Sequence, residues 1–341
     1  MSCIMLKNLI AKAGVKAAMN PIADDMKRVD AMIHTSLGSG IHRVAEVADY
    51  ITSSGGKRMR PALVLLISKA LGYKGDQDVF LGAVIEILHT ATLMHDDVVD
   101  DSPMRRGRPT ANEKWDNPTA VLVGDFLYTR AFQMMVSTGN LRAMAEIAAA
   151  ANRLSEGEVL QMDNAHDPSL SKERYYEVIE RKTACLFKCA AQIACSIANP
   201  PEEQEKALCD YALRLGYAFQ IVDDILDYAG DAATTGKNLG ADLEEGKVTL
   251  PLIYAMQRAS DSDRALIEEA IRKGHGDFDR ISAIVRDTGA LEAARETTRE
   301  EAARGIEALK LAIDRYKEND TVELVHYAQP LLQEADSLAD A

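Results

Sequence analysis

This sequence has few positively charged residues in comparison with negatively charged ones. Its 341 residues include 39 Lys and Arg against 53 Asp and Glu, which gives a formal net charge of −14. Nucleic acids and anionic lipid surfaces are held mainly by clustered positive charge. We therefore expect neither a nucleic-acid partner nor a general affinity for anionic membranes.

Long apolar runs and cysteines are also scarce. No stretch of about 18 apolar residues is uninterrupted, so the sequence predicts no transmembrane segment. Residues 1–20 lack the long apolar region and the cleavage site of a signal peptide, and they predict the beginning of a helix instead. The five cysteines, an odd number, do not form the disulfide framework of a secreted protein, which favours a reducing, cytoplasmic location.

Signals for β-strands are the third absence. Runs of alternating β-branched and aromatic residues are nearly missing, whereas Ala, Leu, Glu, Met and Lys dominate and favour helix. No linker rich in Ser, Gly or Pro divides the chain, so we predict one large all-α domain over residues 1–341. The predicted helices span about 24–37, 41–53, 61–72, 77–100, 118–138, 140–164, 172–198, 202–229, 249–258, 262–273, 278–288, 290–316 and 321–337.

One acidic pattern is present twice, each time at the end of a long apolar helix. The two copies are Asp96-Asp97-Val98-Val99-Asp100 and Asp223-Asp224-Ile225-Leu226-Asp227. Residues four apart share a helix face, so Asp96 pairs with Asp100 and Asp223 with Asp227. Paired carboxylates with room for substrate phosphates suit Mg²⁺. A solvated acidic helix end is the alternative, but helix C-termini disfavour negative charge and the pattern occurs at two of them.

A glycine-rich basic loop precedes the helix predicted from residue 61. Lys57, Arg58 and Arg60 follow Gly55 and Gly56, and a helix N-terminus offers free N–H groups to an anion. The loop therefore predicts a phosphate site, with a basic surface cap as the alternative. It does not fit the pattern of a nucleotide-binding P-loop.

A second basic segment follows the first acidic motif at once. Arg105, Arg106 and Arg108 lie between two prolines, which keep the segment out of a helix. Arginine suits bidentate contact with phosphate, so these side chains and Mg²⁺ are predicted to clamp one anion from two sides. Neutralisation of Asp100 and Asp101 within the chain is the alternative.

Four further polar residues are aligned with the acidic motifs. His89 lies two helical turns before the first motif and Gln220 one turn before the second, each on the same face as its aspartates. Lys182 and Thr183 lie in the helix predicted at 172–198. Lone polar residues on apolar helices are often satisfied core residues, but this alignment favours a shared cavity.

With these motifs in place, the sequence resembles the trans-isoprenyl diphosphate synthase family, in particular its long-chain polyprenyl members. The matching strings are GGKRMRP (55–61), HTATLMHDDVVDDSPMRRGRPTAN (89–112), GDFLYTRAF (124–132), ERKTA (180–184), FQIVDDILDY (219–228) and TGKNLGADLEEGKVTLPLIYA (235–255). They cover a motif-bearing core of about residues 50–260, and residues 261–341 show only amphipathic helices. The resemblance implies an all-α bundle around a deep central cavity, usually homodimeric, that condenses an allylic diphosphate with isopentenyl diphosphate.

The resemblance also implies roles for single residues. The expected Mg²⁺ ligands are Asp96, Asp100 and Asp223, with Asp227 beside them. The acidic walls are completed by Asp97 and Asp224. The expected isopentenyl diphosphate ligands are Lys57, Arg60, His89 and Arg106. The expected contacts to the allylic diphosphate or its developing cation are Arg105, Lys182, Thr183, Gln220 and Lys237. The expected catalytic set is Asp96, Asp97, Asp100, Arg105, Lys182, Asp223 and Asp224.

The expected chemistry is ionisation of the allylic C–O bond, because a cationic, water-poor site stabilises the leaving diphosphate. The double bond of isopentenyl diphosphate then attacks the cation. No His or Glu is clearly placed as a base, so we expect the released pyrophosphate to take the proton.

The residues one and two turns before the first motif predict the product length. In the family, bulky aromatics at the fourth and fifth positions before the first aspartate stop chain growth. Here these positions hold the small residues Thr92 and Ala91, with Leu88 below them. The sequence therefore predicts an octaprenyl to decaprenyl product for quinone side chains, with transient contact with a membrane during its release. Tunnel lining or plain core are the alternatives for Phe132, Met134 and Met135.

Three other functions remain open from the sequence. The first is a shorter-chain farnesyl or geranylgeranyl diphosphate synthase, since the cavity floor is inferred from one helix. The second is a class I terpene cyclase, which ionises the same bond but usually carries a different second metal motif. The third is a non-catalytic helical subunit, which we would expect to have lost aspartates from one motif.

Overall fold

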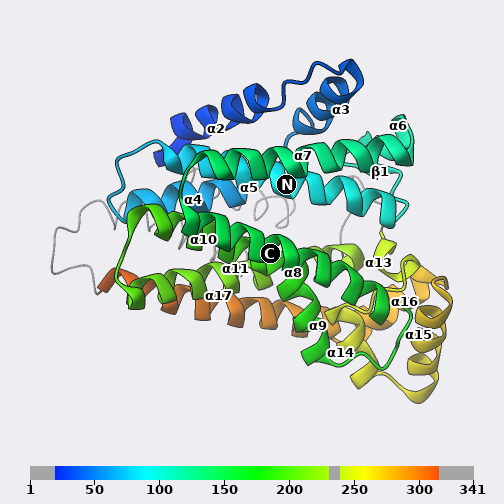
Figure 1. Ribbon diagram of the computed structural model, residues 1–341. Helices are drawn as coiled ribbons and strands as arrows, with labels where there is room; N and C mark the ends of the chain where they lie inside the picture. The colour runs from blue at the N-terminus through cyan, green and yellow to red at the C-terminus, as the bar shows by residue number, and fades with distance from the viewer. Residues whose placement is uncertain (1–19, 230–238, 315–341) are drawn as a thin grey trace, which may run out of the picture.

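The computed structural model describes residues 20–229 and 239–314 (Figure 1). Its first half contains η1 (Asn20–Ile22), α2 (Ala23–Ser36), α3 (His42–Thr52), α4 (Met59–Ala70), α5 (Gln77–Val99), the strands β1 (Met104–Arg105) and β2 (Arg108–Pro109), α6 (Ala111–Lys114) and α7 (Asn117–Ser137). Its second half contains α8 (Leu141–Asn164), α9 (Lys172–Ile179), η2 (Glu180–Ala184), α10 (Cys185–Ala198), α11 (Glu202–Ala229), α13 (Ala241–Glu244), α14 (Leu250–Arg258), α15 (Asp261–Lys273), α16 (Phe278–Asp287) and α17 (Ala290–Asp314). The predicted all-α fold is confirmed.

Most predicted helices agree with the observed ones to within a few residues, because local signals fix their ends. Side chains at five helix starts accept a hydrogen bond from a backbone N–H of the first turn, as capping residues do. These residues are Asp116, Asn140, Ser171, Ser260 and Asp277. The helix predicted at 321–337, the N-terminal residues 1–19 and Lys237 lie outside the described residues.

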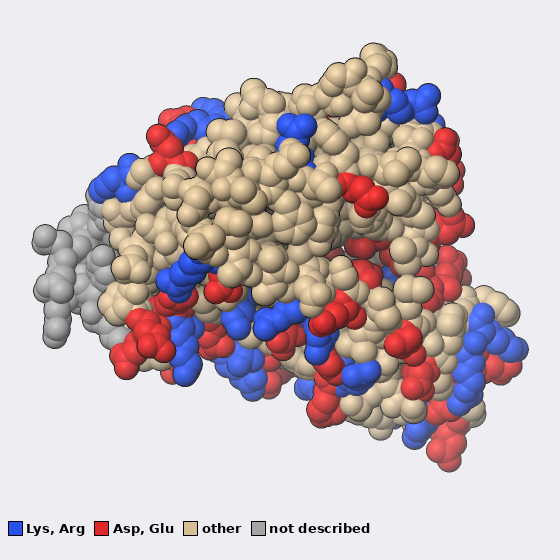
Figure 2. Space-filling view, viewed as in Figure 1, with Lys and Arg blue, Asp and Glu red and all other residues tan. Residues whose placement is uncertain are grey.

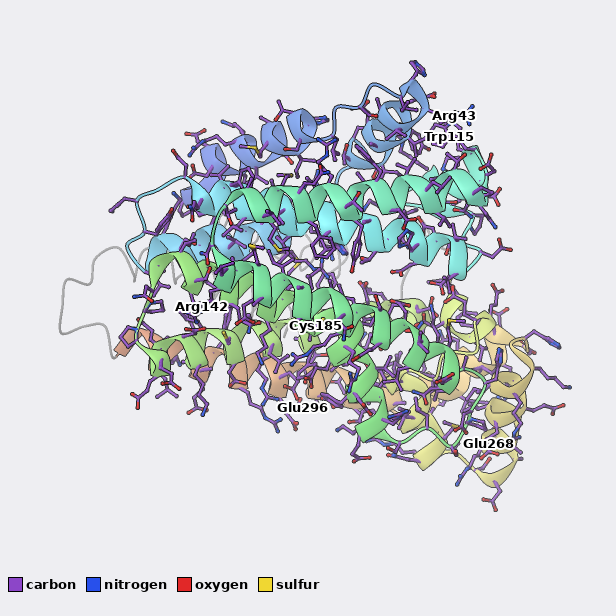
Figure 3. The ribbon with its side chains drawn as sticks, in the orientation of Figure 1. Arg43, Trp115, Arg142, Cys185, Glu268 and Glu296 are labelled. Atoms are coloured by element: carbon purple, nitrogen blue, oxygen red, sulfur yellow. The ribbon has the colours of Figure 1, made fainter. Side chains whose placement is uncertain are left out.

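The long helices form two packed layers (Figure 1). One layer holds α4, α5 and α7, with α2 and α3 along its outer side, and the other holds α8, α11 and α17. Between them runs α10, which packs against α4, α5, α8 and α11. Its residues Ala190, Ala191 and Ala194 are fully buried, and such small side chains let the neighbouring helices approach closely. Figure 3 places Cys185, the first residue of α10, in the middle of the molecule.

Two clusters of buried apolar side chains stabilise the fold. The larger one is built mainly by α2, α4, α5, α7, α8 and α10, and the smaller one by α9, α14, α15 and α16. Both α11 and α17 contribute to both clusters. Among the described residues one helix, α5, is long and apolar enough to cross a membrane, but 72% of its apolar window is buried inside the protein. Its composition therefore reflects a position in the core.

The structure adds two features that the sequence did not predict. A two-stranded antiparallel hairpin, β1–β2, follows the first acidic motif, with Arg105 opposite Arg108. The helix predicted at 172–198 is interrupted at 180–184 by the π-helical turn η2. Turns of this kind often occur at functional sites. This one carries Lys182 and Thr183.

Candidate active site

The first acidic motif occupies the last turn of α5, and its aspartates have different environments. Asp97 is 2% exposed and accepts a hydrogen bond from Nε of Arg105 at 2.7 Å. Asp96 lies on another face and is half-buried. Burial raises the pKa of Asp96 to about 7, an effect that the nearby Lys182 ammonium opposes and that Glu158 reinforces. A cation beside Asp96 would favour its ionised form.

The second motif lies near the end of α11, and again only part of it faces outward. Asp223 is exposed, whereas Asp224 is 3% exposed. Both oxygens of Asp224 are occupied, since it accepts from the Tyr175 hydroxyl at 2.6 Å and from Nε2 of Gln220 at 2.8 Å. Burial raises the pKa of Asp224 to about 7, and these two hydrogen bonds oppose the shift.

Asp227 and Asp100 tie both motifs to one short segment, residues 240–247. The backbone N–H groups of Gly240 and Asp242 donate to the Asp227 carboxylate at 3.1 and 3.2 Å. Farther along the same segment, Nζ of Lys247 contacts Oδ2 of Asp100 at 3.2 Å. The two acidic helix ends therefore belong to one region of the molecule, as the predicted site requires.

Lys247 is the cation at this junction. Burial lowers the pKa of its ammonium group, but the carboxylates of Asp100, Glu245 and Asp242 outweigh burial and raise it. Burial, together with the neighbouring Asp227, raises the pKa of Asp242 well above its usual value. In Figure 2 acidic side chains gather in and around a hollow between the layer of α5 and α7 and the part of the chain that contains α13.

The π-turn η2 brings Lys182 and Thr183 into the same region. A π-turn is wider than an α-helical turn, so its neighbours must make room. A Cβ on Gly157 of α8 would lie 2.8 Å from the backbone nitrogen of Lys182, and one on Gly216 of α11 would lie 2.6 Å from Cα of Ala184. Both positions therefore require glycine. Lys182 forms an ion pair with Glu158 at 2.8 Å, and this pair lies beside Asp96.

The glycine-rich loop divides its basic residues between two sides. Lys57 lies over the ring of Phe219 at 5.0 Å and Arg60 over the ring of Phe187 at 4.6 Å. These two rings contact each other, with their centroids 5.5 Å apart. Arg60 is therefore buried against α10, whereas Lys57 lies against α11 and remains exposed.

Arg58, between them, turns the other way. Its backbone is left-handed (φ 50°), and its guanidinium binds Asp30 at 3.2 Å, Glu86 at 2.8 Å and the carbonyl of Thr52 at 3.2 Å. These contacts join α4 to α2 and α5. Arg58 therefore stabilises the conformation of the loop.

Arg60 is a buried cation without a full set of partners. The residue is 8% exposed, and its Nε has no hydrogen-bond partner. Burial lowers its pKa to about 10, while Glu86 and, more weakly, Asp223 offset part of this shift. A buried charge that lacks hydrogen bonds is costly, and an anion placed beside it would remove that cost.

His89 and Arg106 surround the same position. Burial lowers the pKa of His89 well below its usual value, and Arg60 and Arg106 lower it further. The Arg106 guanidinium passes so close to Gly56 that a Cβ there would lie 3.0 Å from it. The neutral imidazole and the two guanidinium groups therefore form a concentrated set of hydrogen-bond donors with excess positive charge, which suits a diphosphate.

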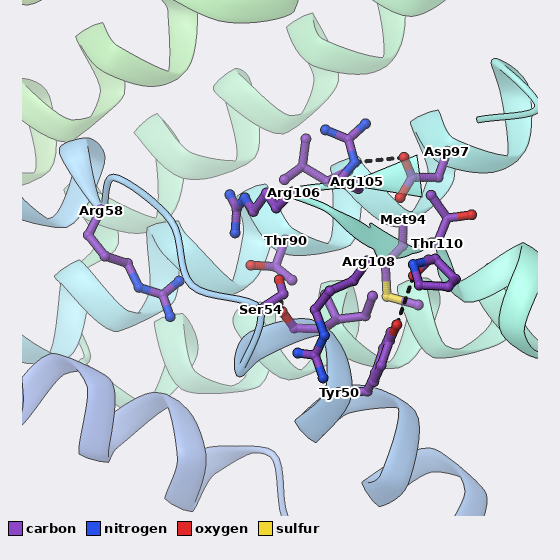
Figure 4. A pocket seen from close by; sticks show the side chains of 13 residues that line it. Tyr50, Ser54, Arg58, Thr90, Met94, Asp97, Arg105, Arg106, Arg108 and Thr110 are labelled. Carbon is purple, nitrogen blue, oxygen red and sulfur yellow. Dashed lines mark hydrogen bonds and ion pairs between the residues drawn. The ribbon is translucent and has the colours of Figure 1, made fainter. Parts of the chain in front are cut away.

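A small pocket lies behind this position, between α3, α5 and the hairpin (Figure 4). Thr90, Met94 and Asp97 line it from α5, and Tyr50 lines it from α3. The Tyr50 hydroxyl donates to the carbonyl of Pro109 at 2.9 Å. Arg105 of the hairpin donates to Asp97 of α5, and this contact orients the Arg105 side chain. The pocket therefore lies between the hairpin and α5.

The residues predicted to set product length are mostly packed. Leu88 and Ala91 are fully buried and Met135 is 3% exposed, all within the larger apolar cluster. Thr92 is half-buried, and its hydroxyl donates to the carbonyl of His89. Phe132 is half-buried and contacts the ring of Tyr128 edge-on at 5.1 Å. Of the predicted positions on α5, Thr92 is the one with exposed surface.

The donors of the two motifs fit Mg²⁺. All are carboxylate oxygens, which this hard cation prefers, in pairs one helical turn apart. Within residues 20–229 and 239–314, no group of three His, Cys, Asp or Glu side chains is close enough to hold a metal ion unaided. Magnesium is commonly bound by one or two carboxylates with the remaining positions filled by water and substrate phosphates, so this arrangement agrees with a site that the substrate completes. Asp224 is 3% exposed and already accepts two hydrogen bonds, so it is less accessible to a metal ion than the exposed Asp223.

Sequence reasoning missed four residues that the fold brings to the site: Glu158, Tyr175, Asp242 and Lys247. The contacts of Glu158, Tyr175 and Lys247 join segments at least 24 positions apart. A signal was available for Asp242 and Lys247, because both belong to a string already used for the resemblance. Glu158 and Tyr175 stand on helices without any local irregularity in sequence, so no local pattern could have found them.

Comparisons with known proteins agree with this geometry. A family model described as polyprenyl synthetase matches residues 41–288. The octaprenyl diphosphate synthase of Escherichia coli (strain K12) is 45% identical over 308 residues, which are 90% of this chain and 95% of that protein. The polyprenyl synthase of Caulobacter crescentus CB15, solved with calcium and isoprenyl diphosphate, has a TM-score of 0.89 and 35% identity, covering 96% of this chain and 98% of that one. A decaprenyl diphosphate synthase from Rhodobacter capsulatus has a TM-score of 0.86 and 40% identity, covering 95% and 98%.

Proposed function

The chain belongs to the polyprenyl synthetase family and is a trans-prenyltransferase, and we propose that it joins an allylic diphosphate to successive isopentenyl diphosphates. The product is a long-chain all-trans polyprenyl diphosphate of octaprenyl to decaprenyl length. Identity of 45% to an octaprenyl diphosphate synthase and of 40% to a decaprenyl diphosphate synthase supports this length. The observation that carries the mechanism is the linkage of both acidic helix ends through residues 240–247, with Lys247 on Asp100.

We assign the metal to Mg²⁺, held by Asp96 and Asp100 on one side and by Asp223 on the other, with Asp227 beside it. When bound, the metal supplies charge stabilisation for the diphosphate that leaves the allylic carbon. Asp227 is oriented by the backbone N–H groups of Gly240 and Asp242. Asp97 and Asp224 act from behind, because each is buried and already bound to a neighbour.

The chain itself supplies the remaining positive charge for the allylic diphosphate. Lys182 extends beside Asp96, and Arg105 is held at the base of the motif by Asp97. Donors fixed in advance stabilise developing charge without reorganising during the reaction. Lys182 and Arg105 are therefore proposed to bind the diphosphate and assist its departure.

Isopentenyl diphosphate is proposed to bind at Lys57, Arg60, His89 and Arg106. Two observations support this site: Arg60 is buried with its Nε unpartnered, and burial together with Arg60 and Arg106 lowers the pKa of His89. The half-buried Phe219 ring beneath Lys57 offers an apolar surface on which a short hydrocarbon can lie. The proton lost after attack is proposed to pass to the released pyrophosphate.

Product length is proposed to depend on the face of α5 below Asp96. Thr92 is half-buried one turn down, and it is small enough to let a growing chain pass. On α7, which packs against α5, the rings of Phe132 and Tyr128 contact each other, and this aromatic pair is proposed as the point that limits growth. A quinone side chain is the use expected for a product of this length.

A homodimer is proposed as the functional assembly. Apolar side chains stand exposed on α7 and α8, among them Leu122 (66%), Leu141 (77%) and Val159 (58%). Figure 2 shows a broad area around α7 with few charged side chains. Large exposed apolar patches mark interaction sites, and a second copy of the chain is the partner that the family resemblance implies.

The scarcity of cysteine supports the expected cytoplasmic location.

The test is incubation with Mg²⁺, farnesyl diphosphate and labelled isopentenyl diphosphate, followed by mass measurement of the dephosphorylated product. We expect label in products of octaprenyl to decaprenyl length. Products that stop at farnesyl or geranylgeranyl length would favour the shorter-chain alternative. An unlabelled hydrocarbon would indicate a cyclase, and no turnover at all would indicate a non-catalytic subunit.

A further inference from the structure

A continuous chain of hydrogen bonds runs from helix α9 to the π-turn. The Tyr175 hydroxyl donates to Oδ2 of Asp224 at 2.6 Å, and Nε2 of Gln220 donates to Oδ1 of Asp224 at 2.8 Å. The Thr183 hydroxyl donates to Oε1 of Gln220 at 2.7 Å. Tyr175, Thr183 and Asp224 are 3%, 6% and 3% exposed, so little water competes for these bonds.

The direction of every bond in this chain follows from its starting point. Asp224 accepts from the Tyr175 hydroxyl and from the amide nitrogen of Gln220, and its ionised form can only accept, so ionised Asp224 keeps the nitrogen of Gln220, and not its oxygen, turned toward it. The Gln220 oxygen is thereby turned toward Thr183. The Thr183 hydroxyl must then donate its hydrogen to Gln220, which leaves its oxygen lone pairs for another group.

The opposite orientation of the amide would reverse this result. If Gln220 turned its nitrogen to Thr183, the Thr183 hydroxyl would accept, and its hydrogen would be free to point elsewhere. An allylic cation is stabilised by oxygen lone pairs and repelled by the positive end of an O–H bond. The orientation of one buried amide therefore decides the sign of the dipole that Thr183 presents.

We propose that Tyr175 is a positioning residue, whose hydroxyl holds Asp224 in the geometry that keeps the Gln220 oxygen on the Thr183 hydroxyl, so that Thr183 presents its oxygen lone pairs to the allylic cation. This inference rests on the proposed prenyl transfer and extends it to a residue outside the acidic and basic motifs. The Tyr175 hydroxyl is bound to Asp224 and acts through it.

The first experiment compares two adjacent tyrosines. Tyr175→Phe removes only the hydroxyl and preserves the edge-on contact with the ring of Tyr176. Tyr176→Phe is the matched control, because its hydroxyl binds Glu301, which Arg214 and Arg304 also hold. We expect Tyr175→Phe to lower the single-turnover rate of the first condensation about tenfold with KM for both substrates unchanged, and Tyr176→Phe to match the wild type.

The second experiment is a double-mutant cycle with Thr183→Val. If Tyr175 acts through Thr183, adding Tyr175→Phe to Thr183→Val produces no further loss of rate. A rate for Tyr175→Phe equal to that of Tyr176→Phe would overturn the inference. So would a tenfold loss that multiplies with the loss caused by Thr183→Val, because a purely structural defect behaves in that way.

These experiments distinguish a failure of the role proposed for Tyr175 from a failure of the proposed prenyltransferase function. Wild-type protein that makes polyprenyl diphosphate while Tyr175→Phe behaves like the control rejects the role of Tyr175 alone. Wild-type protein that makes no prenyl product rejects the proposed function. Thermal unfolding of both phenylalanine variants shows whether either substitution has altered the fold.

Discussion

The ammonium nitrogen of Lys247 lies 3.2 Å from Oδ2 of Asp100, although the two residues are 147 positions apart in the chain. Both side chains are largely buried, with 16% and 17% exposed. Lys247 also pairs with Glu245 and lies near Asp242. One cation thus compensates several carboxylates, and it stands at an aspartate proposed to bind Mg²⁺.

Lys247→Met should therefore destabilise the protein most when no divalent cation is present. The substitution leaves buried carboxylates without their counter-charge. Removing one partner of a buried ion pair lowers the free energy of unfolding by about 3 kcal/mol. Magnesium with inorganic diphosphate should restore part of the loss. Thermal unfolding with chelator and with Mg²⁺ plus diphosphate measures both effects. Lys273→Met is the control, because Lys273 forms an exposed pair with Glu269; an equal shift in both variants would contradict the special role of Lys247.

Asp96→Ala and Asp223→Ala should each lower turnover roughly 100-fold or more, because each removes a ligand that stabilises the leaving diphosphate. Both variants should retain the helical circular dichroism of the wild type. Asp101→Asn is the matched control, since Asp101 is exposed, lies just after the first motif and has a left-handed backbone (φ 48°) that Asn tolerates. Near-wild-type turnover in either alanine variant would count against the paired site.

Thr92→Phe should shorten the product. An aromatic ring at this half-buried position would close the face of α5 below Asp96, whereas Thr92→Ser should leave the product length unchanged. Mass analysis of the dephosphorylated products distinguishes the two. Ala91→Tyr is also expected to shorten the product, but Ala91 is fully buried, so overpacking should cost about 1–3 kcal/mol of stability as well. Unchanged chain length in Thr92→Phe would refute the proposed tunnel.

The stability of the protein should depend on pH through His89. Its pKa is lowered in the folded state, so below the ordinary value of 6.5 the unfolded chain binds more protons than the folded one. His89 therefore has no effect on the free energy of unfolding above pH 6.5. As the pH falls below 6.5, the free energy of unfolding decreases by up to about 1.4 kcal/mol per pH unit for one proton. Urea unfolding at several pH values should show a shallower slope for His89→Gln. Added inorganic diphosphate should also flatten the wild-type slope, because it neutralises the neighbouring arginines; identical slopes in all three cases would contradict the assignment.

A charge placed on the exposed apolar face of α7 should dissociate the proposed homodimer. Leu122→Glu puts a carboxylate among exposed apolar side chains, and burying it between two copies would be strongly unfavourable. Light scattering after gel filtration should report a dimer for the wild type and a monomer for this variant. Leu311→Glu, on α17, is the control for an exposed leucine outside that face. A monomeric wild type, or a dimeric Leu122→Glu variant, would contradict the proposed interface.

Much of the fold was predictable from local patterns. Helical periodicity located the ends of α5 and α11 and showed that Asp96 and Asp100 share a face, because residues four apart are neighbours whatever the helix packs against. The π-turn at 180–184 was not predictable in this way. It depends on space that Gly157 and Gly216 leave on two other helices, and neither glycine is near it in sequence.

The composition and motifs by themselves determined that this protein is all-helical, acidic and equipped with two aspartate pairs and two basic segments. Only the tertiary structure decided which of these groups face one another. It turned Arg60 toward α10 and Arg58 toward α2 and α5, bonded Asp224 to Tyr175 and Gln220, and set Lys247 on Asp100. The physical reason is that helix faces follow from spacing along the chain, whereas hydrogen bonds and ion pairs between distant segments follow from how the helices pack.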